Sequence, residues 1–157
     1  MMTRRAIILT LMLTMQLGGC TSQPVTRNTP MPKTLLIEIR MDSEDQKHTY
    51  LHVDRNDMLH FAGGTMAAAG MTEPMLKITR EQRRKLWQII RDHDLFQTHS
   101  NQATGDVLTT WNIMLQADRS RHRFRWVTTT EHQAVHQGVQ QLQTTLFQIY
   151  KDHRYPK

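Results

Sequence analysis

The sequence has a single cysteine, Cys20, among 157 residues, and it is poor in proline, glycine and aromatic side chains. One cysteine excludes a disulfide framework within the chain and a zinc or iron–sulfur site built on several cysteines. Five prolines and seven glycines exclude a collagen-like chain, and 38% hydrophobic residues exclude a wholly disordered one. The one long apolar run lies near the N-terminus, which excludes a multi-span membrane protein.

That apolar run is organised like a secretion signal. Arg4 and Arg5 precede an apolar stretch over residues 6–15, and small residues follow before a cleavage point. A membrane-spanning helix, the alternative interpretation, needs ~20 apolar residues, which this stretch does not reach. We therefore predict a signal peptide over residues 1–19.

The motif Leu17-Gly18-Gly19-Cys20 resembles the lipobox of bacterial lipoprotein precursors. The resemblance implies that the Cys20 thiol receives a diacylglycerol, that the chain is cut before it, and that its new amino group is acylated. Several acyl chains make a stable membrane anchor. Thr21 follows the cysteine, and in the enterobacterial sorting pattern a residue other than Asp here implies the outer membrane, facing the periplasm. An ordinary secreted protein with a cysteine near its cleavage site is the alternative.

The segment after the cleavage point is polar and rich in proline. Residues 20–32 hold three prolines with Ser, Thr and Asn and no apolar period, which predicts a lipidated N-terminus followed by a disordered tether. One globular domain, residues 33–157, would follow. Loss of Arg4 and Arg5 with the leader lowers the formal charge from +6 by two, to +4. An excess of this size indicates no nucleic-acid partner.

The domain alternates between strand and helix patterns. Period-two alternation predicts strands over residues 34–41, 48–54, 107–117 and 122–129, with a possible short one at 58–62. The last two long strands form a hairpin. Thr79 and Thr130 each open a Thr-x-x-Gln capping box before apolar residues at helical spacing. We predict a two-layer α+β fold, an antiparallel sheet with two helices, in the order strand-strand-(strand)-helix-strand-strand-helix.

The last predicted strand carries a row of basic side chains. Arg121, Arg123 and Arg125 alternate with apolar and aromatic residues, so they form a ladder on one strand face, ~6.6–6.8 Å apart. A guanidinium group suits bidentate contact with phosphate or carboxylate. Lipid A phosphates or an acidic envelope protein would fit an outer-membrane location. A solvated sheet face is the alternative interpretation.

Residues 63–72 form an irregular stretch rich in Gly, Ala and Met, with little charge. Gly63-Gly64-Thr65 is no phosphate loop, because the Gly-Lys-Ser/Thr ending of that motif is missing. Gly63, Gly64, Met66 and Met71 fit either a mobile, weakly apolar contact loop or a flexible connection.

The nine histidines do not predict a metal site. Two pairs lie four residues apart, His48 with His52 on a strand and His132 with His136 on a predicted helix. Zinc needs three or four ligands, so solvated surface pairs are the better interpretation. His93, flanked by Asp92 and Asp94, falls on the apolar stripe of its helix and is interpreted as a packed, hydrogen-bonded side chain.

No motif for nucleophilic catalysis is present, since the chain lacks G-x-S-x-G and the resemblance to lipoprotein precursors implies that Cys20 is acylated. We predict no catalytic residue and no cofactor besides the covalent diacylglycerol and N-acyl chain on Cys20. The expected function is that of a lipoprotein anchored in the cell envelope, which binds or helps assemble another envelope protein or an anionic lipid. The order of elements resembles small bacterial protease inhibitors of the emfourin type, so a periplasmic protease or hydrolase inhibitor is the alternative.

Overall fold

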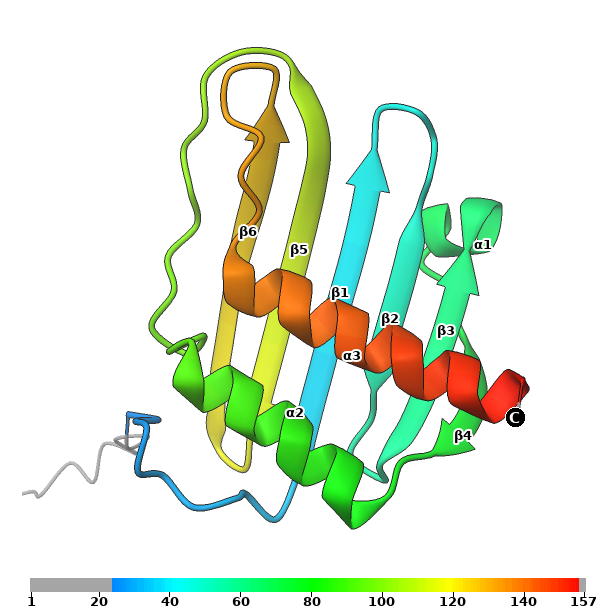
Figure 1. Cartoon of the computed structure of the whole chain (residues 1–157), viewed down its shortest axis with the longest axis vertical. Coiled ribbons are helices and arrows are strands. Elements are labelled where there is room, and N and C mark those ends of the chain that lie inside the picture. Colours follow the sequence, from blue (N-terminus) through cyan, green and yellow to red (C-terminus); the bar gives the residue numbers. More distant parts are fainter. Residues whose placement is uncertain (1–23, 156–157) are drawn as a thin grey trace, which may run out of the picture.

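The computed structural model describes residues 24–155, which form a mixed α/β fold dominated by one antiparallel sheet (Figure 1). In chain order its elements are β1 (Leu35–Ser43), β2 (Thr49–Val53), β3 (Met58–Gly63), α1 (Gly64–Ala68), β4 (Glu73–Lys77), α2 (Arg80–Asp92), β5 (Val107–Ala117), β6 (Ser120–Thr129) and α3 (Gln137–Arg154). The predicted signal peptide and Cys20 lie outside the described residues.

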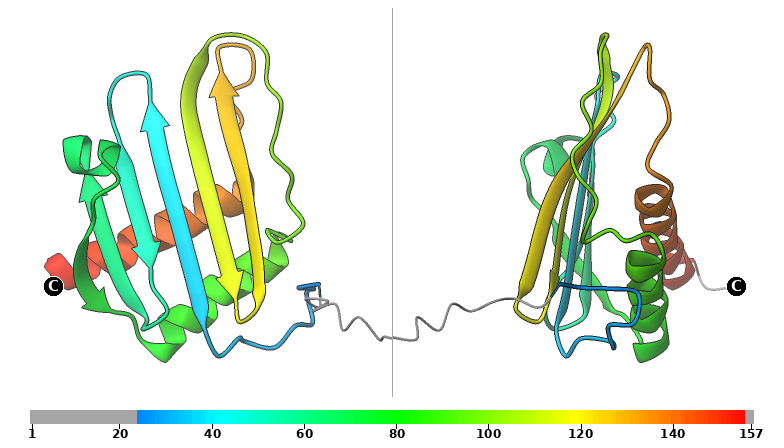
Figure 2. Two further views of the ribbon diagram at one scale, coloured as in Figure 1. Left: turned by 180° about the vertical axis from the view of Figure 1, so that it is seen from behind. Right: turned by 90° about the vertical axis from the view of Figure 1, so that its left-hand side faces the viewer.

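The six strands pair in the spatial order β4-β3-β2-β1-β5-β6. Helices α2 and α3 lie against one face of the sheet and contact each other, while the short α1 lies on the other side, beside β2 and β3 (Figure 2). We call the face that α2 and α3 leave uncovered the open face. Its central and β6-side positions are Glu38, Arg40, Asn112, Met114, Arg123 and Arg125.

The hydrophobic core lies between the sheet and the two long helices. In the strand register Ile37 of β1 stands between Val53 of β2 and Leu115 of β5, and all three side chains are fully buried. Their neighbours in sequence point to the open face, as the period-two pattern predicts for strands. The predicted alternation along these three strands is confirmed.

Helix α2 begins where the sequence predicts it. The Thr79 hydroxyl accepts a hydrogen bond from the backbone N–H of Gln82, and the Gln82 side-chain oxygen accepts one from the backbone N–H of Thr79. This capping box satisfies two amides that the first helical turn would otherwise leave unpaired.

Helix α3 begins later than the sequence predicts, because its N-cap is His136 rather than Thr130. The intervening residues are held by the sheet: the indole N–H of Trp126 on β6 donates to the carbonyl of Ala134 at 3.0 Å. This tertiary contact, together with the hydrogen bond from the backbone N–H of His132 to the Thr129 hydroxyl, leaves residues 130–135 outside the helix, so the predicted capping box at Thr130 does not form and its prediction is wrong. Local capping preference is worth only ~1 kcal/mol, which packing readily overrides.

Two elements were not clearly predicted. Helix α1 occupies the first half of the stretch expected to be irregular, and β4 adds an edge strand to the sheet. Pro74 lies in this edge strand, where a missing N–H removes no ladder hydrogen bond that the sheet needs. The predicted combination of helices with an antiparallel sheet is confirmed, but the described residues hold three helices rather than two.

Residues 24–32, which we call the N-terminal segment, are packed against α2 and so differ from the predicted disordered tether. The indole N–H of Trp87 donates to the carbonyl of Thr29 at 3.3 Å, and the Arg91 guanidinium donates to that of Arg27 at 2.8 Å. The side chain of Val25 is only 9% exposed. The segment turns back at residues 26–29, where the backbone N–H of Thr29 donates to the carbonyl of Thr26 at 2.9 Å, and it needs no sheet partner because α2 supplies donors to its carbonyls.

Candidate functional site

The open face carries a basic depression of about 520 Å³. It is lined by Glu38, Arg40, Ser100, Asn112, Ile113, Met114, Arg123, Phe124 and Arg125. The strand register explains the grouping, because Arg125, Asn112 and Arg40 stand in one row across β6, β5 and β1. Arg123, Met114 and Glu38 form the next row. Three arginines and one glutamate therefore line the same depression.

The predicted arginine ladder lies on one face of β6, as expected from the alternation with His122 and Phe124. All three arginines are exposed, while Phe124 between them is only 5% exposed. The ladder is nevertheless divided. Arg123 and Arg125 line the basic depression, whereas Arg121 lines a different hollow with His122 at the start of β6.

The arginines of the depression differ in how much of their charge is already paired. Arg40 forms an ion pair with Asp42 at 3.0 Å and donates to the carbonyl of Ala68 at 3.0 Å. The Arg125 side chain has one long contact, 3.5 Å, to the hydroxyl of Thr110. Within residues 24–155, Arg123 makes no side-chain hydrogen bond or ion pair, so its guanidinium group is free to bind an anion.

The one carboxylate of the depression, Glu38, already accepts a hydrogen bond from a neighbouring side chain. The Glu38 side chain accepts a hydrogen bond from the Tyr50 hydroxyl at 2.7 Å. Burial raises the pKa of the Tyr50 phenol, and the hydrogen bond to Glu38 raises it further. Tyr50 therefore stays protonated and keeps donating, which leaves the guanidinium groups as the interacting groups of this surface.

A pair of stacked imidazoles lies beside this carboxylate on β2 and β3. The rings of His52 and His60 are 5.1 Å apart between centroids. Burial lowers the pKa of His52, and the neighbouring His60 lowers it further, although Glu38 and Asp54 act in the opposite direction. The neutral form of the His52 imidazole is therefore favoured, so His52 adds no permanent positive charge to this part of the open face, unlike the arginines.

The segment predicted to be a contact loop is joined to the open face by Arg40. Gly64 has a φ of 59°, which only glycine adopts readily, and it opens α1. Met66 and Met71 are 38% and 55% exposed, among the most exposed large apolar side chains described. Gly63 lies at the junction of β3 and α1. Because α1 lies on the side of the sheet opposite α2 and α3, the predicted contact loop borders the open face, which also carries the basic depression (Figure 2).

The structure separates the predicted histidine pairs. His132 and His136 do not share a helical face, because residues 130–136 precede α3. The Nδ1–H of His48 donates a hydrogen bond to the Asp42 carboxylate at 3.0 Å, while His52 stacks on His60 of β3. His93 contacts the side chain of Gln141 at 2.7 Å. Residues 24–155 hold no group of three or more His, Cys, Asp or Glu side chains that could bind a metal ion.

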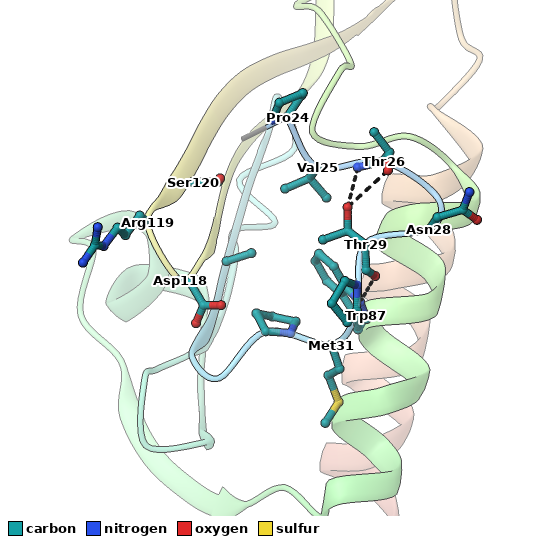
Figure 3. Close-up of a pocket in the computed structure, with 13 residues that line it drawn as sticks. Pro24, Val25, Thr26, Asn28, Thr29, Met31, Trp87, Asp118, Arg119 and Ser120 are labelled. Atoms are coloured by element: carbon teal, nitrogen blue, oxygen red, sulfur yellow. Dashed lines mark hydrogen bonds between the residues drawn. The ribbon is translucent and has the colours of Figure 1, made fainter. Parts of the chain in front are cut away.

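A second hollow, of about 600 Å³, separates the N-terminal segment from the turn between β5 and β6 (Figure 3). Val25, Met31 and Trp87 give it an apolar side, and Asp118 and Arg119 of the turn give it a polar one. In Figure 3 the Arg119 guanidinium points away from this hollow. Sequence reasoning did not find this hollow, because it depends on the docking of the N-terminal segment.

Sequence reasoning also missed Arg40 as a member of the site. Its outward position could be deduced from the alternation along β1. Its place opposite Asn112, and thus beside Arg125, depends on β1 pairing with β5 rather than only with β2. That pairing is a long-range contact, which no local pattern specifies.

A scan against models of protein families matches none, and a search of curated proteins finds no matching sequence. No helix within residues 24–155 is long and apolar enough to cross a membrane. What the chain binds therefore has to be inferred from its own surfaces.

Proposed function

We propose that the chain is the precursor of an envelope lipoprotein, anchored in the outer membrane through acyl chains on Cys20 and facing the periplasm. The globular domain would be a two-layer α+β module, with α2 and α3 as one layer and the sheet as the other. Its open face binds an acidic group of another envelope component. No cofactor is involved besides the covalent lipid on Cys20.

The observation that carries the proposal is the arginine-lined depression. Arg40, Arg123 and Arg125 bring three permanent positive charges to one surface, and Arg123 has no partner among the described residues. A guanidinium group binds carboxylate or phosphate through two parallel hydrogen bonds, which is stronger and more directional than contact with an ammonium group. Asn112 and Ser100 add neutral polar groups at the rim.

Binding fits this surface better than catalysis does. The depression offers donors and positive charge, which hold an anion in place. Glu38, its one carboxylate, already accepts the hydrogen bond from Tyr50. A general base needs a free lone pair within hydrogen-bond reach of its substrate, and the neighbouring hydroxyl competes for that position.

The test is recovery of the partner after crosslinking in intact cells. The variant Arg123→Gln with Arg125→Gln should lower specific recovery by about tenfold or more, because charge-assisted hydrogen bonds are worth ~1.5–3 kcal/mol each. The matched control is Arg84→Gln with Lys85→Gln, which removes the same charge from exposed positions on α2, across the sheet. Cys20→Ala reports the contribution of the anchor.

The outcomes separate the alternatives. Equal recovery from the two double variants would contradict a binding role for the depression. If the partner is a hydrolase whose activity falls on binding, the protein is an inhibitor; if that activity is unchanged, the protein serves assembly.

A further inference from the structure

The N-terminal segment leads to one particular end of the sheet. Pro24, the first described residue, lines the hollow shared by Gln97 and Arg121, and it also lines the hollow bordered by Arg119. Pro24 therefore lies beside the turn between β5 and β6. Figure 1 shows this turn at the opposite end of the sheet from the turn between β1 and β2.

The docking of this segment shortens the connection between anchor and domain. Only residues 21–23 separate Cys20 from Pro24, so the two Cα atoms can be at most ~14 Å apart. A free tether over the whole of residues 20–32 would have reached ~45 Å. Acyl chains on Cys20 would thus hold the β5–β6 turn close to the bilayer surface.

The charge of this end suits a bilayer with anionic headgroups. Arg119 and Arg121 are exposed and make no ion pair within residues 24–155. Lys33 is also exposed, and it precedes Thr34, whose backbone pairs with Asp118 of the same turn. The nearby acid Asp118 accepts a hydrogen bond from the backbone N–H of Thr34 at 2.9 Å. Arg27 does not add to the positive charge available at this end, because its guanidinium forms an ion pair with Asp94 at 2.9 Å.

We propose that the β5–β6 end of the domain, with Lys33, Arg119 and Arg121, lies against anionic lipid headgroups of the membrane that holds the Cys20 acyl chains. This inference rests on the proposed function, because it requires the lipid on Cys20. In this orientation the arginines of the predicted ladder have two different roles. Arg121 contacts the membrane, while Arg123 and Arg125 lie farther from it along β6, by ~7 Å and ~13 Å, and remain available to a partner.

The orientation is measurable with a fluorophore on a single introduced cysteine, since Cys20 is the only native one and carries the lipid. Gln97→Cys places the label beside Pro24, and Glu44→Cys places it in the β1–β2 turn. The lipidated full-length protein is reconstituted in phosphatidylcholine vesicles with a minor share of phosphatidylglycerol and with a nitroxide quencher on headgroups. The label at position 97 should be quenched several-fold more than the label at position 44.

Two double variants test the role of charge. Arg119→Gln with Arg121→Gln should reduce the difference between the two labels toward unity, as should vesicles of phosphatidylcholine alone. Lys77→Gln with Lys151→Gln removes the same charge near β4, five strand spacings or ~24 Å across the sheet, and should keep the difference.

Each opposite result overturns the inference. Equal quenching at the two positions would show a domain without preferred orientation, and a difference unaffected by loss of Arg119 and Arg121 would show that these charges do not set it. The mass of the intact protein shows whether Cys20 carries acyl groups, and so distinguishes failure of the proposed function from failure of the proposed orientation. Without acyl groups on Cys20 the proposed function fails as well, whereas an acylated protein with equal quenching overturns the orientation alone.

Discussion

The arginines of β6 look equivalent in the sequence but have different surroundings. Arg123 lacks a partner within the described residues, Arg125 has one long hydrogen bond, and Arg121 lies at a different hollow. Period-two alternation places all three on one face and says nothing about what stands beside each of them. The neighbours come from other strands, and they decide which guanidinium can bind an anion.

His52 provides a prediction about acid stability. Burial, and then His60, lower its pKa below the ordinary value of 6.5, so the unfolded state binds a proton more readily than the folded state does. Stability should therefore decrease as the pH falls through about 6.5. His52→Gln should give a shallower decrease in the free energy of unfolding between about pH 7.5 and about pH 5, measured by urea unfolding.

The matched control for His52 is His99→Gln. His99 is exposed and makes no side-chain hydrogen bond within residues 24–155, so the slope should stay as in the wild type. Equal slopes for the wild type and His52→Gln would show that the stacked pair does not contribute to acid sensitivity.

The helices and strands that have strong local sequence signals are the ones whose observed positions agree best with the predictions. The hairpin of β5 and β6 has alternation on both sides of a short turn, and α2 has a capping box with an apolar stripe. α3 has the same start signal in the sequence but begins at a later residue, and β4 was not among the predicted strands. The elements whose position depends on long-range contacts are the ones that sequence patterns placed poorly or not at all.

The two predicted capping boxes, of which only the one at Thr79 forms, give a prediction at this scale. Thr79→Ala should lower the free energy of unfolding by about 1 kcal/mol, because the observed cap of α2 loses its acceptor for the Gln82 amide. Thr130→Ala should change it by less than ~0.5 kcal/mol, since α3 begins after His136 and Thr130 caps no helix. Urea unfolding of the two variants compares them directly. A larger loss at Thr130 than at Thr79 would contradict the helix starts seen in the structure.

At the scale of the whole molecule, the N-terminal segment links distant parts of the chain. It contributes Val25 to the core and supplies carbonyls to Trp87 and Arg91 of α2. A sequence of this composition predicts disorder because it lacks an apolar period of its own. Its order comes from donors on another element, so composition alone could not reveal it.

Val25→Asp should therefore destabilise the domain although it lies outside every helix and strand. A carboxylate at a position that is 9% exposed loses hydration without an assigned partner, which should cost about 1–3 kcal/mol. Tryptophan emission should shift to longer wavelength as Trp87, now 2% exposed, becomes wetter. Asn28→Asp adds the same charge at an exposed position of the segment and should leave both readouts unchanged. Wild-type stability for Val25→Asp would mean that the segment does not pack.

The sequence by itself determined the α+β class, the faces of the central strands, the start of α2 and the β5–β6 hairpin. These features follow from periodicity and capping, which act between residues close in the chain. The pairing of β1 with β5, the late start of α3, the grouping of Arg40 with Arg123 and Arg125, and the docking of residues 24–32 were decided by the tertiary structure. They depend on which surfaces meet in space, and the free energy of those contacts exceeds the small local preferences that a sequence pattern records.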